Sequence, residues 1–161
     1  MLDHGDFRLY ETHAILRYLD AILPGPALQP NEPKAIARMS QIANIVDWYV
    51  NPSVTLGIVA ERFLSQVFWN RPTDETNIAN ALPQARICVR ELERLKGDAE
   101  FMVGNELSIA DLMLAPHMAI FSMTPEGQEM LSGSPLLVWL ARMSKRESWA
   151  ATETDRLLKA A

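Results

Sequence analysis

The chain has 161 residues, a hydrophobic fraction of 48% and a formal net charge of −5, with 15 lysines and arginines in total. This length fits one domain, or one domain and a fragment of another, and the hydrophobic fraction can bury a core without disulfide or metal cross-links. The acidic balance argues against nucleic-acid and anionic-membrane partners, because both require a basic surface.

The cysteine content and the apolar runs bear on the cellular compartment. Cys88 is the single cysteine, so the chain cannot form an internal disulfide and a reducing compartment is expected. The segment MLDHGDFRLYE at the start lacks the basic and apolar regions of a signal peptide. No apolar run approaches the roughly 18 residues of a membrane span. We therefore expect a cytoplasmic protein without a membrane partner.

Residues 1–10 predict a β-hairpin followed at once by a helix. Phe7 and Leu9 alternate with polar residues, and a turn signal stands before them at residues 4–6. A two-stranded hairpin is only marginally stable in water, so it needs further strands or a covering helix. A helix beginning at residues 11–12 supplies apolar positions with helical spacing, at Ile15, Tyr18, Leu19 and Ile22.

The segment from Leu23 to Pro33 contains four prolines and one glycine, which predicts an extended linker. Helical spacing then continues, with Asn31 as the expected N-cap and Pro33 in the first turn. Pro52 predicts a kink or a break in this first long helical segment, which extends to about residue 69. Thr73 or Asp74 is expected to cap the next long helix, in which Pro83 predicts a kink or a delayed start.

Three further helix starts carry recognisable caps. Ser108 and Asp111 have the spacing of a capping box, so we assign Asp111 a structural role and not a catalytic one. Thr124 and Ser134 each stand before a proline as a hydroxyl N-cap, and a last helix is expected from about residue 147. The sequence therefore predicts a mainly α protein with a hairpin and helix over residues 1–23, a linker over 24–33 and an all-α domain over 34–161.

Two motifs in this order resemble the glutathione S-transferase family. The segment MLDHGDFRLYETHAILRYLD resembles the end of that family's N-terminal thioredoxin-like domain, and FMVGNELSIADLMLAP is similar to a helix start in its all-α C-terminal domain. The residues that match the first motif are Gly5, Leu9, Glu11, Thr12, Ala14, Ile15, Tyr18 and Leu19. The resemblance covers nearly the whole chain, and it implies a C-terminal helical bundle preceded by a β-hairpin and helix remnant of a thioredoxin-like domain.

The resemblance implies a protein that, in its complete form, conjugates or reduces substrates with glutathione. In the family, the serine, tyrosine or cysteine that activates the thiol stands earlier in the thioredoxin-like domain, together with a cis-proline that binds glutathione. No residue of this chain matches them, so no catalytic residue is assigned, and we expect a shortened transferase with very weak glutathione affinity and no turnover by itself. A misassigned start codon would give the same beginning. A small electrophile or a peroxide is the implied substrate, and a homodimer is the implied assembly.

Glu11 and Thr12 are the candidate glutathione-binding residues. A helix N-terminus offers free N–H groups to the α-carboxylate of the γ-glutamyl group, the Thr12 hydroxyl can donate to the same carboxylate, and Glu11 can pair with the ammonium group. Spacing alone favours a simpler interpretation, in which Thr12 is an ordinary N-cap that serves only folding. The resemblance reverses this preference.

The remaining candidates have weaker support. Tyr49 is a candidate for the wall of an apolar substrate pocket, as the family places such a pocket along the helix after the linker. His13 stands beside Thr12 and either borders the ligand site or is simply exposed. The histidines share no metal-ligand spacing, so no metal site is expected, and Cys88 lies on an apolar helix stripe as a buried small side chain. A non-catalytic helical docking module remains the alternative hypothesis for the whole chain.

Overall fold

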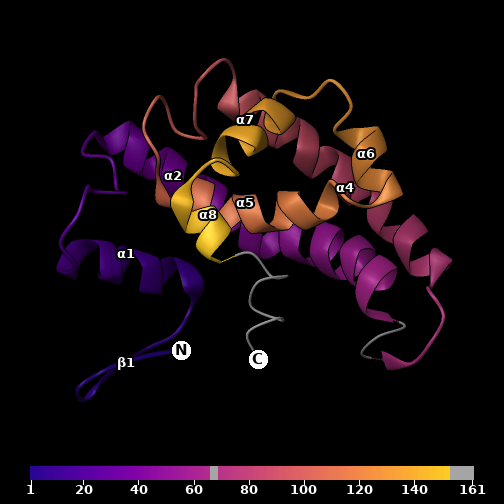
Figure 1. The fold of residues 1–161 in the computed structure, drawn as a ribbon, viewed down its shortest axis with the longest axis horizontal. Coiled ribbons are helices and arrows are strands. Elements are labelled where there is room, and N and C mark those ends of the chain that lie inside the picture. Colours follow the sequence, from indigo (N-terminus) through magenta and orange to yellow (C-terminus); the bar gives the residue numbers. More distant parts are fainter. Residues whose placement is uncertain (66–68, 153–161) are drawn as a thin grey trace.

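The computed structural model describes residues 1–65 and 69–152. Figure 1 shows a hairpin and one helix, α1, set beside a larger group of helices that runs from α2 to α8. The prediction of a mainly α protein is confirmed, whereas the division into units at residues 23 and 33 stays a prediction. The parts of the predicted helices that fall on residues 66–68 and 153–161 lie outside the described residues. Within the described residues, no helix combines the length and the apolar character that crossing a membrane requires.

The predicted hairpin is present. Strand β1 (Leu2–His4) pairs antiparallel with β2 (Phe7–Leu9), and Gly5 turns the chain at a φ of 63°, a conformation that suits glycine. Tyr18 of helix α1 covers the hairpin, because its ring lies 5.4 Å from the ring of Phe7 and its hydroxyl lies 2.6 Å from Nδ1 of His4. The hairpin therefore gains the covering helix that it needs.

Helix α1 (Thr12–Ile22) is held mainly through the linker. Asp20 accepts hydrogen bonds from the backbone N–H groups of Leu28 and Gln29, at 2.7 and 3.1 Å, and Nε of Arg17 donates to the Gln29 side chain at 2.7 Å. No residue of α1 is fully buried, although Leu16 packs against the core of the helical domain. The helix is thus docked on that domain by a shallow surface.

The first helical segment of the main domain runs without a break. Helix α2 (Pro33–Ile45) begins after Glu32, whose side chain accepts from the N–H of Ala35 at 2.8 Å, so the prediction of Asn31 as N-cap is wrong by one residue. It passes directly into η1 (Val46–Leu64), which is wound as a π-helix. The predicted break near Pro52 is absent. Pro52 is exposed, so water can bond the carbonyl that the proline leaves without a donor.

Helix α4 (Glu75–Lys96) packs along η1. Asp74 is its N-cap, as one of the two predicted candidates, and the helix starts well before Pro83, so that proline does not delay the start. The two helices approach closely at Gly57, where a Cβ atom would lie only 2.5 Å from the Cβ of Ala81. Any larger residue at position 57 would force the two helices apart.

The buried carboxylate of Glu61 joins the end of η1 to the start of α4. It accepts two hydrogen bonds from Arg71, at 2.7 and 2.8 Å, one from the side chain of Asn77 and one from the N–H of Asp74. The hydrogen bonds from Arg71 are the main reason that the pKa of Glu61 falls to about 2, against the opposing effect of burial. Glu61 therefore stays charged and bonded at neutral pH.

Helix α5 (Ile109–Phe121) is the central helix of the domain and contacts α1, α2, η1, α6 and α7. Helices α6 (Pro125–Met130), α7 (Pro135–Met143) and α8 (Glu147–Ala151) complete the described chain. The predicted caps are confirmed. The capping box of Ser108 and Asp111 is present, and Thr124 and Ser134 each accept an amide hydrogen bond at the start of α6 and α7.

The side chain of Asp111 does more than cap its own helix. Fully buried at 0% exposure, it accepts four hydrogen bonds: from the N–H and the hydroxyl of Ser108, both at 2.9 Å, from the N–H of Met102 at 2.8 Å, and from Nε1 of Trp139 at 2.8 Å. The carboxylate therefore joins the start of α5, the preceding loop and the middle of α7.

We expect Asp111→Ala to lower the free energy of unfolding by about 3–5 kcal/mol, because it leaves several buried donors without an acceptor. The measurement is urea denaturation followed by circular dichroism. Asp74→Ala is the matched control, since Asp74 caps α4 at an exposed position and its loss should cost only about 1 kcal/mol. Equal losses for the two variants would contradict the proposed importance of the buried network.

Candidate functional site

The start of α1 has an unusual backbone conformation. Glu11 is the residue before the first helical turn, and it has φ 72° and ψ 119°, a combination that is rare for any residue with a side chain. Such a conformation costs about 1–3 kcal/mol and persists mainly at functional sites. The carbonyl of Glu11 nevertheless accepts the N–H of Ile15 at 2.9 Å, so the helix starts regularly after this residue.

No side chain caps the first turn of α1. The residue before the helix is Glu11 and not Thr12, and it makes no side-chain capping hydrogen bond. The interpretation of Thr12 as an ordinary N-cap is therefore wrong, because Thr12 is already the first helical residue. The short helix α8, which begins after Arg146, also lacks a side-chain cap. Other helices begin with a side-chain cap or a capping box, and their capping residues are Glu32, Asp74, Ser108, Thr124 and Ser134.

This turn has the chemistry of a site for a small anion with a neighbouring cation. The N–H groups of an uncapped first turn point along the helix axis, and with the helix dipole they attract a carboxylate. The side chains of Glu11 and Thr12 are both exposed beside it, one negatively charged and one with a hydroxyl donor. An α-amino acid group, with its carboxylate on the turn and its ammonium near Glu11, matches this arrangement.

His13, the next residue, is close enough to the helical domain to interact with Asp47 of η1. It is half-buried, and its Nε2 atom is buried without a hydrogen-bond partner in the described part of the chain. Burial lowers the pKa of His13 below its ordinary value, the charge of Arg17 lowers it further, and the charge of Asp47 on η1 opposes both. The sequence left open whether this residue borders the site or is exposed, and its half-buried position argues against simple exposure.

A second histidine lies in the same region and was not assigned a role from the sequence. Nδ1 of His117 on α5 lies 2.6 Å from the hydroxyl of Thr55 on η1. Burial lowers the pKa of His117, while Asp47 again opposes the shift. The two histidines therefore interact with the same carboxylate. No short motif could have revealed this, since Thr55 and His117 are 62 positions apart.

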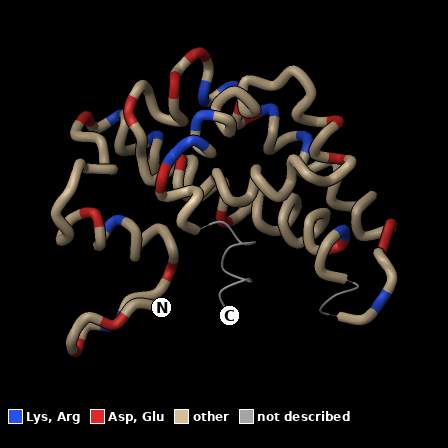
Figure 2. The backbone as a smooth tube through the Cα atoms, in the orientation of Figure 1, with Lys and Arg blue, Asp and Glu red and all other residues tan. Residues whose placement is uncertain are grey.

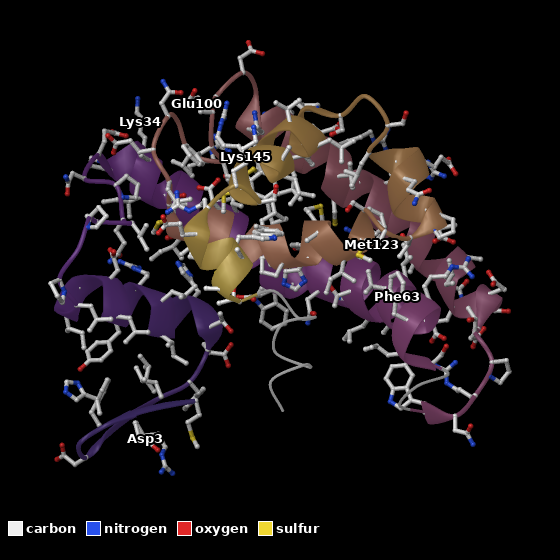
Figure 3. The ribbon with its side chains drawn as sticks, viewed as in Figure 1. Asp3, Lys34, Phe63, Glu100, Met123 and Lys145 are labelled. Atoms are coloured by element: carbon white, nitrogen blue, oxygen red, sulfur yellow. The ribbon has the colours of Figure 1, made fainter. Side chains whose placement is uncertain are left out.

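Tyr49 and Cys88 have different surroundings. Tyr49, the pocket candidate, lies on η1 with its side chain 52% exposed, and Phe63 further along the same helix is also exposed (Figure 3). Cys88 is buried as expected, near the Ser53 hydroxyl and the Gln84 amide. Among the described residues, no group of three or more His, Cys, Asp or Glu side chains could hold a metal ion.

Figure 2 shows acidic and basic residues on both the hairpin–α1 unit and the helical domain. Arg62 of η1, for example, bonds Glu75 of α4 and Glu126 of α6, and Arg8 bonds Asp3 across the hairpin. These arginines are therefore paired with carboxylates instead of being gathered on one face.

The sequence of this chain is similar to those of curated proteins. No protein-family model matches the chain. It is 32% identical over 132 residues to Glutathione S-transferase 1 of Dianthus caryophyllus, an alignment that covers 81% of this chain and 57% of the relative. It is 27% identical over 161 residues to Glutathione S-transferase F14 of Arabidopsis thaliana, and this alignment covers 94% of this chain and 61% of the relative. The chain therefore spans 57–61% of the length of these curated relatives.

Solved structures show the same fold. Glutathione transferase F2 from Populus trichocarpa superposes with a TM-score of 0.81 at 20% identity, over 99% of this chain and 74% of that one. A structure of glutathione S-transferase III in apo form gives a TM-score of 0.79 at 20% identity, over 93% of this chain and 69% of that one. At these identities the likeness shows the fold alone.

The strain at Glu11 has a measurable consequence. We expect Glu11→Gly to be more stable than Glu11→Ala by about 1 kcal/mol, because glycine adopts positive φ without the cost that a Cβ imposes. Thermal denaturation of the two variants measures the difference. At Ala79, an exposed position within α4, the order should be opposite, and Ala79→Gly should cost about 0.5–1 kcal/mol. If the glycine variant at position 11 is the less stable of its pair, the strain is refuted.

Proposed function

The chain belongs to the glutathione S-transferase family, and from this premise we propose that it binds the γ-glutamyl end of glutathione at the first turn of α1. The observation that carries the proposal is the uncapped turn behind a strained and exposed Glu11. A turn that served only folding would gain from a capping side chain and from a relaxed backbone. This turn has neither, so its N–H groups are available to an anionic ligand.

Each residue has one role in the proposed complex. The N–H groups of the first turn and the hydroxyl of Thr12 donate to the α-carboxylate of glutathione, while the carboxylate of Glu11 accepts from the ammonium group. Hydrogen bonds to charged groups of this kind are worth about 1.5–3 kcal/mol each. Only one end of the tripeptide is held in this way, so we expect a dissociation constant on the order of 1 mM, equivalent to about −4 kcal/mol.

We propose that the protein, in its complete form, carries out glutathione transfer. The thiolate of bound glutathione attacks an electrophilic carbon, a carbon–sulfur bond forms, and the leaving group departs with its bonding electrons. With a peroxide, the thiolate attacks oxygen instead and the O–O bond breaks. The chain's own residues bind and orient the tripeptide, and we assign the activation of its thiol to none of them.

Two further assignments belong to the same proposal. Tyr49 is proposed to contact the electrophile, since its exposed ring lies on the helix after the linker, where an apolar substrate could pack. A homodimer is proposed as the assembly, supported by exposed apolar side chains such as Trp48 and Leu56 on η1. The comparisons do not favour the alternative of a non-catalytic docking module.

Titration with glutathione, followed by NMR chemical shifts of the backbone amides, tests the binding site. We expect the amides of residues 12–14 to shift, because they contact the carboxylate directly. Glu11→Ala and Thr12→Val should each weaken binding by about 10-fold, the equivalent of about 1.4 kcal/mol for the loss of one charge-assisted hydrogen bond.

The control is Thr76→Val, which changes an exposed threonine in the first turn of α4, a turn already capped by Asp74. It should leave glutathione binding unchanged. Shifts that gather elsewhere, with the amides of residues 12–14 unmoved, would refute the proposed site.

A further inference from the structure

We infer that His13 is a positioning residue that anchors the glutathione-binding turn of α1 to the helical domain, and that this anchor holds only while its imidazole is neutral. The inference rests on the proposed function, because it assigns a means of regulation to the same turn. It depends on three features of the described residues: the buried Nε2 atom of the half-buried His13, the shallow docking of α1, and the position of the His13 backbone within the turn itself.

His13 contributes its backbone to the proposed binding turn and its side chain to the proposed anchor. Its backbone N–H is one of the first-turn groups that face an anion, because the helix begins at Thr12. Its side chain has a different surrounding, because Nε2 is buried and the imidazole is close enough to Asp47 of η1 to interact with it. Leu16, three residues further and therefore on the same face of α1, packs against the domain core. The ring of His13 and the side chain of Leu16 thus hold the start of α1 in place.

Little else holds this end of the helix. None of its residues is fully buried, and its polar attachments to the linker are made by Arg17 and Asp20, in the second half of the helix. Helix α1 also contacts α5 of the main domain. A change at His13 can therefore move the binding turn without unfolding the domain.

The charges around His13 decide the direction of the effect. Arg17 comes from α1 itself, Asp47 comes from η1, and His117 on α5 interacts with the same Asp47. Burial and Arg17 disfavour the imidazolium form more strongly than Asp47 favours it, so the pKa of His13 is lower when α1 is docked than when it is free.

The sign of the pH dependence follows from this lowered pKa. The undocked helix binds the proton more readily, so docking is favoured above the ordinary histidine value of about 6.5 and is lost as the pH falls below it. One proton is involved, so the docking equilibrium changes by no more than about tenfold per pH unit. Glutathione binds the docked turn, and its affinity should therefore fall with the same profile.

The experiment compares wild type with His13→Gln, which is neutral at every pH and keeps a polar group of similar length. Two quantities are measured between pH 7.5 and 5.5: amide hydrogen exchange in α1, corrected for the intrinsic rate, and the dissociation constant of glutathione by calorimetry. In wild type we expect protection of α1 and glutathione affinity to fall together on acidification. In His13→Gln both should stay constant.

Two further variants separate an anchor from general acid sensitivity. His117→Gln removes the other half-buried histidine and should keep the wild-type profile, because His117 lies on α5. Asp47→Asn removes the charge that raises the pKa of docked His13, so the loss of docking should begin at the same pH and become larger on further acidification. Circular dichroism of the helical domain at each pH confirms that the core stays folded in each variant.

The outcomes are distinct. An unchanged pH profile in His13→Gln overturns the inference, as does a wild-type affinity that rises on acidification, which would show that the imidazolium pairs with Asp47. If α1 shows the His13-dependent transition and glutathione does not bind at any pH, the anchor is supported and the proposed function is refuted.

Discussion

The buried carboxylate of Asp111 is the interaction on which the rest of the arrangement depends. It holds the start of α5 against the loop before it and against Trp139 of α7, and so fixes where the central helix begins. Helices α1, α2, η1, α6 and α7 all contact α5, so the position of α5 affects how α1, which carries the proposed binding turn, is docked. A buried charge of this kind is stable only when it is fully hydrogen-bonded, and here both oxygens are used.

The first turn of α1, the proposed binding turn, differs from Asp111 in its hydrogen bonding. At Asp111 every polar group is satisfied within the protein, whereas the first turn of α1 leaves its N–H groups without a side-chain acceptor and holds Glu11 in a strained conformation. Strain and unused donors are costs that folding would remove. The first turn of α1 combines both, whereas α8, which also lacks a side-chain cap, begins after Arg146 in an ordinary extended conformation, so the combination supports the proposed ligand site. His13 connects these two parts of the molecule, because its backbone lies in the first turn of α1 while its Nε2 atom is buried.

The sequence could predict the features that depend on neighbouring residues. The hairpin, the start of α1, the capping box at Ser108 and the caps at Thr124 and Ser134 are local patterns, and each is present. The N-cap of α2 lies one residue later than predicted because Glu32, with a longer side chain than the usual caps, accepts a hydrogen bond from the N–H of Ala35. The backbone angle of Glu11 and the proximity of Thr55 to His117 could not be predicted, because the first depends on how α1 is docked and the second joins helices far apart in the chain.

The linker belongs partly to each of the units that it joins. The N–H of Ile109, the first residue of α5, donates to the carbonyl of Leu28 at 3.2 Å, so a linker residue completes the start of the central helix. Residues 24–27, in contrast, are all exposed. Proteolytic cleavage within residues 24–27 would therefore leave the start of α5 intact, and α1 would stay held without a covalent link by the hydrogen bonds of Asp20 to Leu28 and Gln29. The same boundary suits domain exchange, because a different N-terminal unit could be joined ahead of Leu28 without removing any hydrogen bond from the helical core.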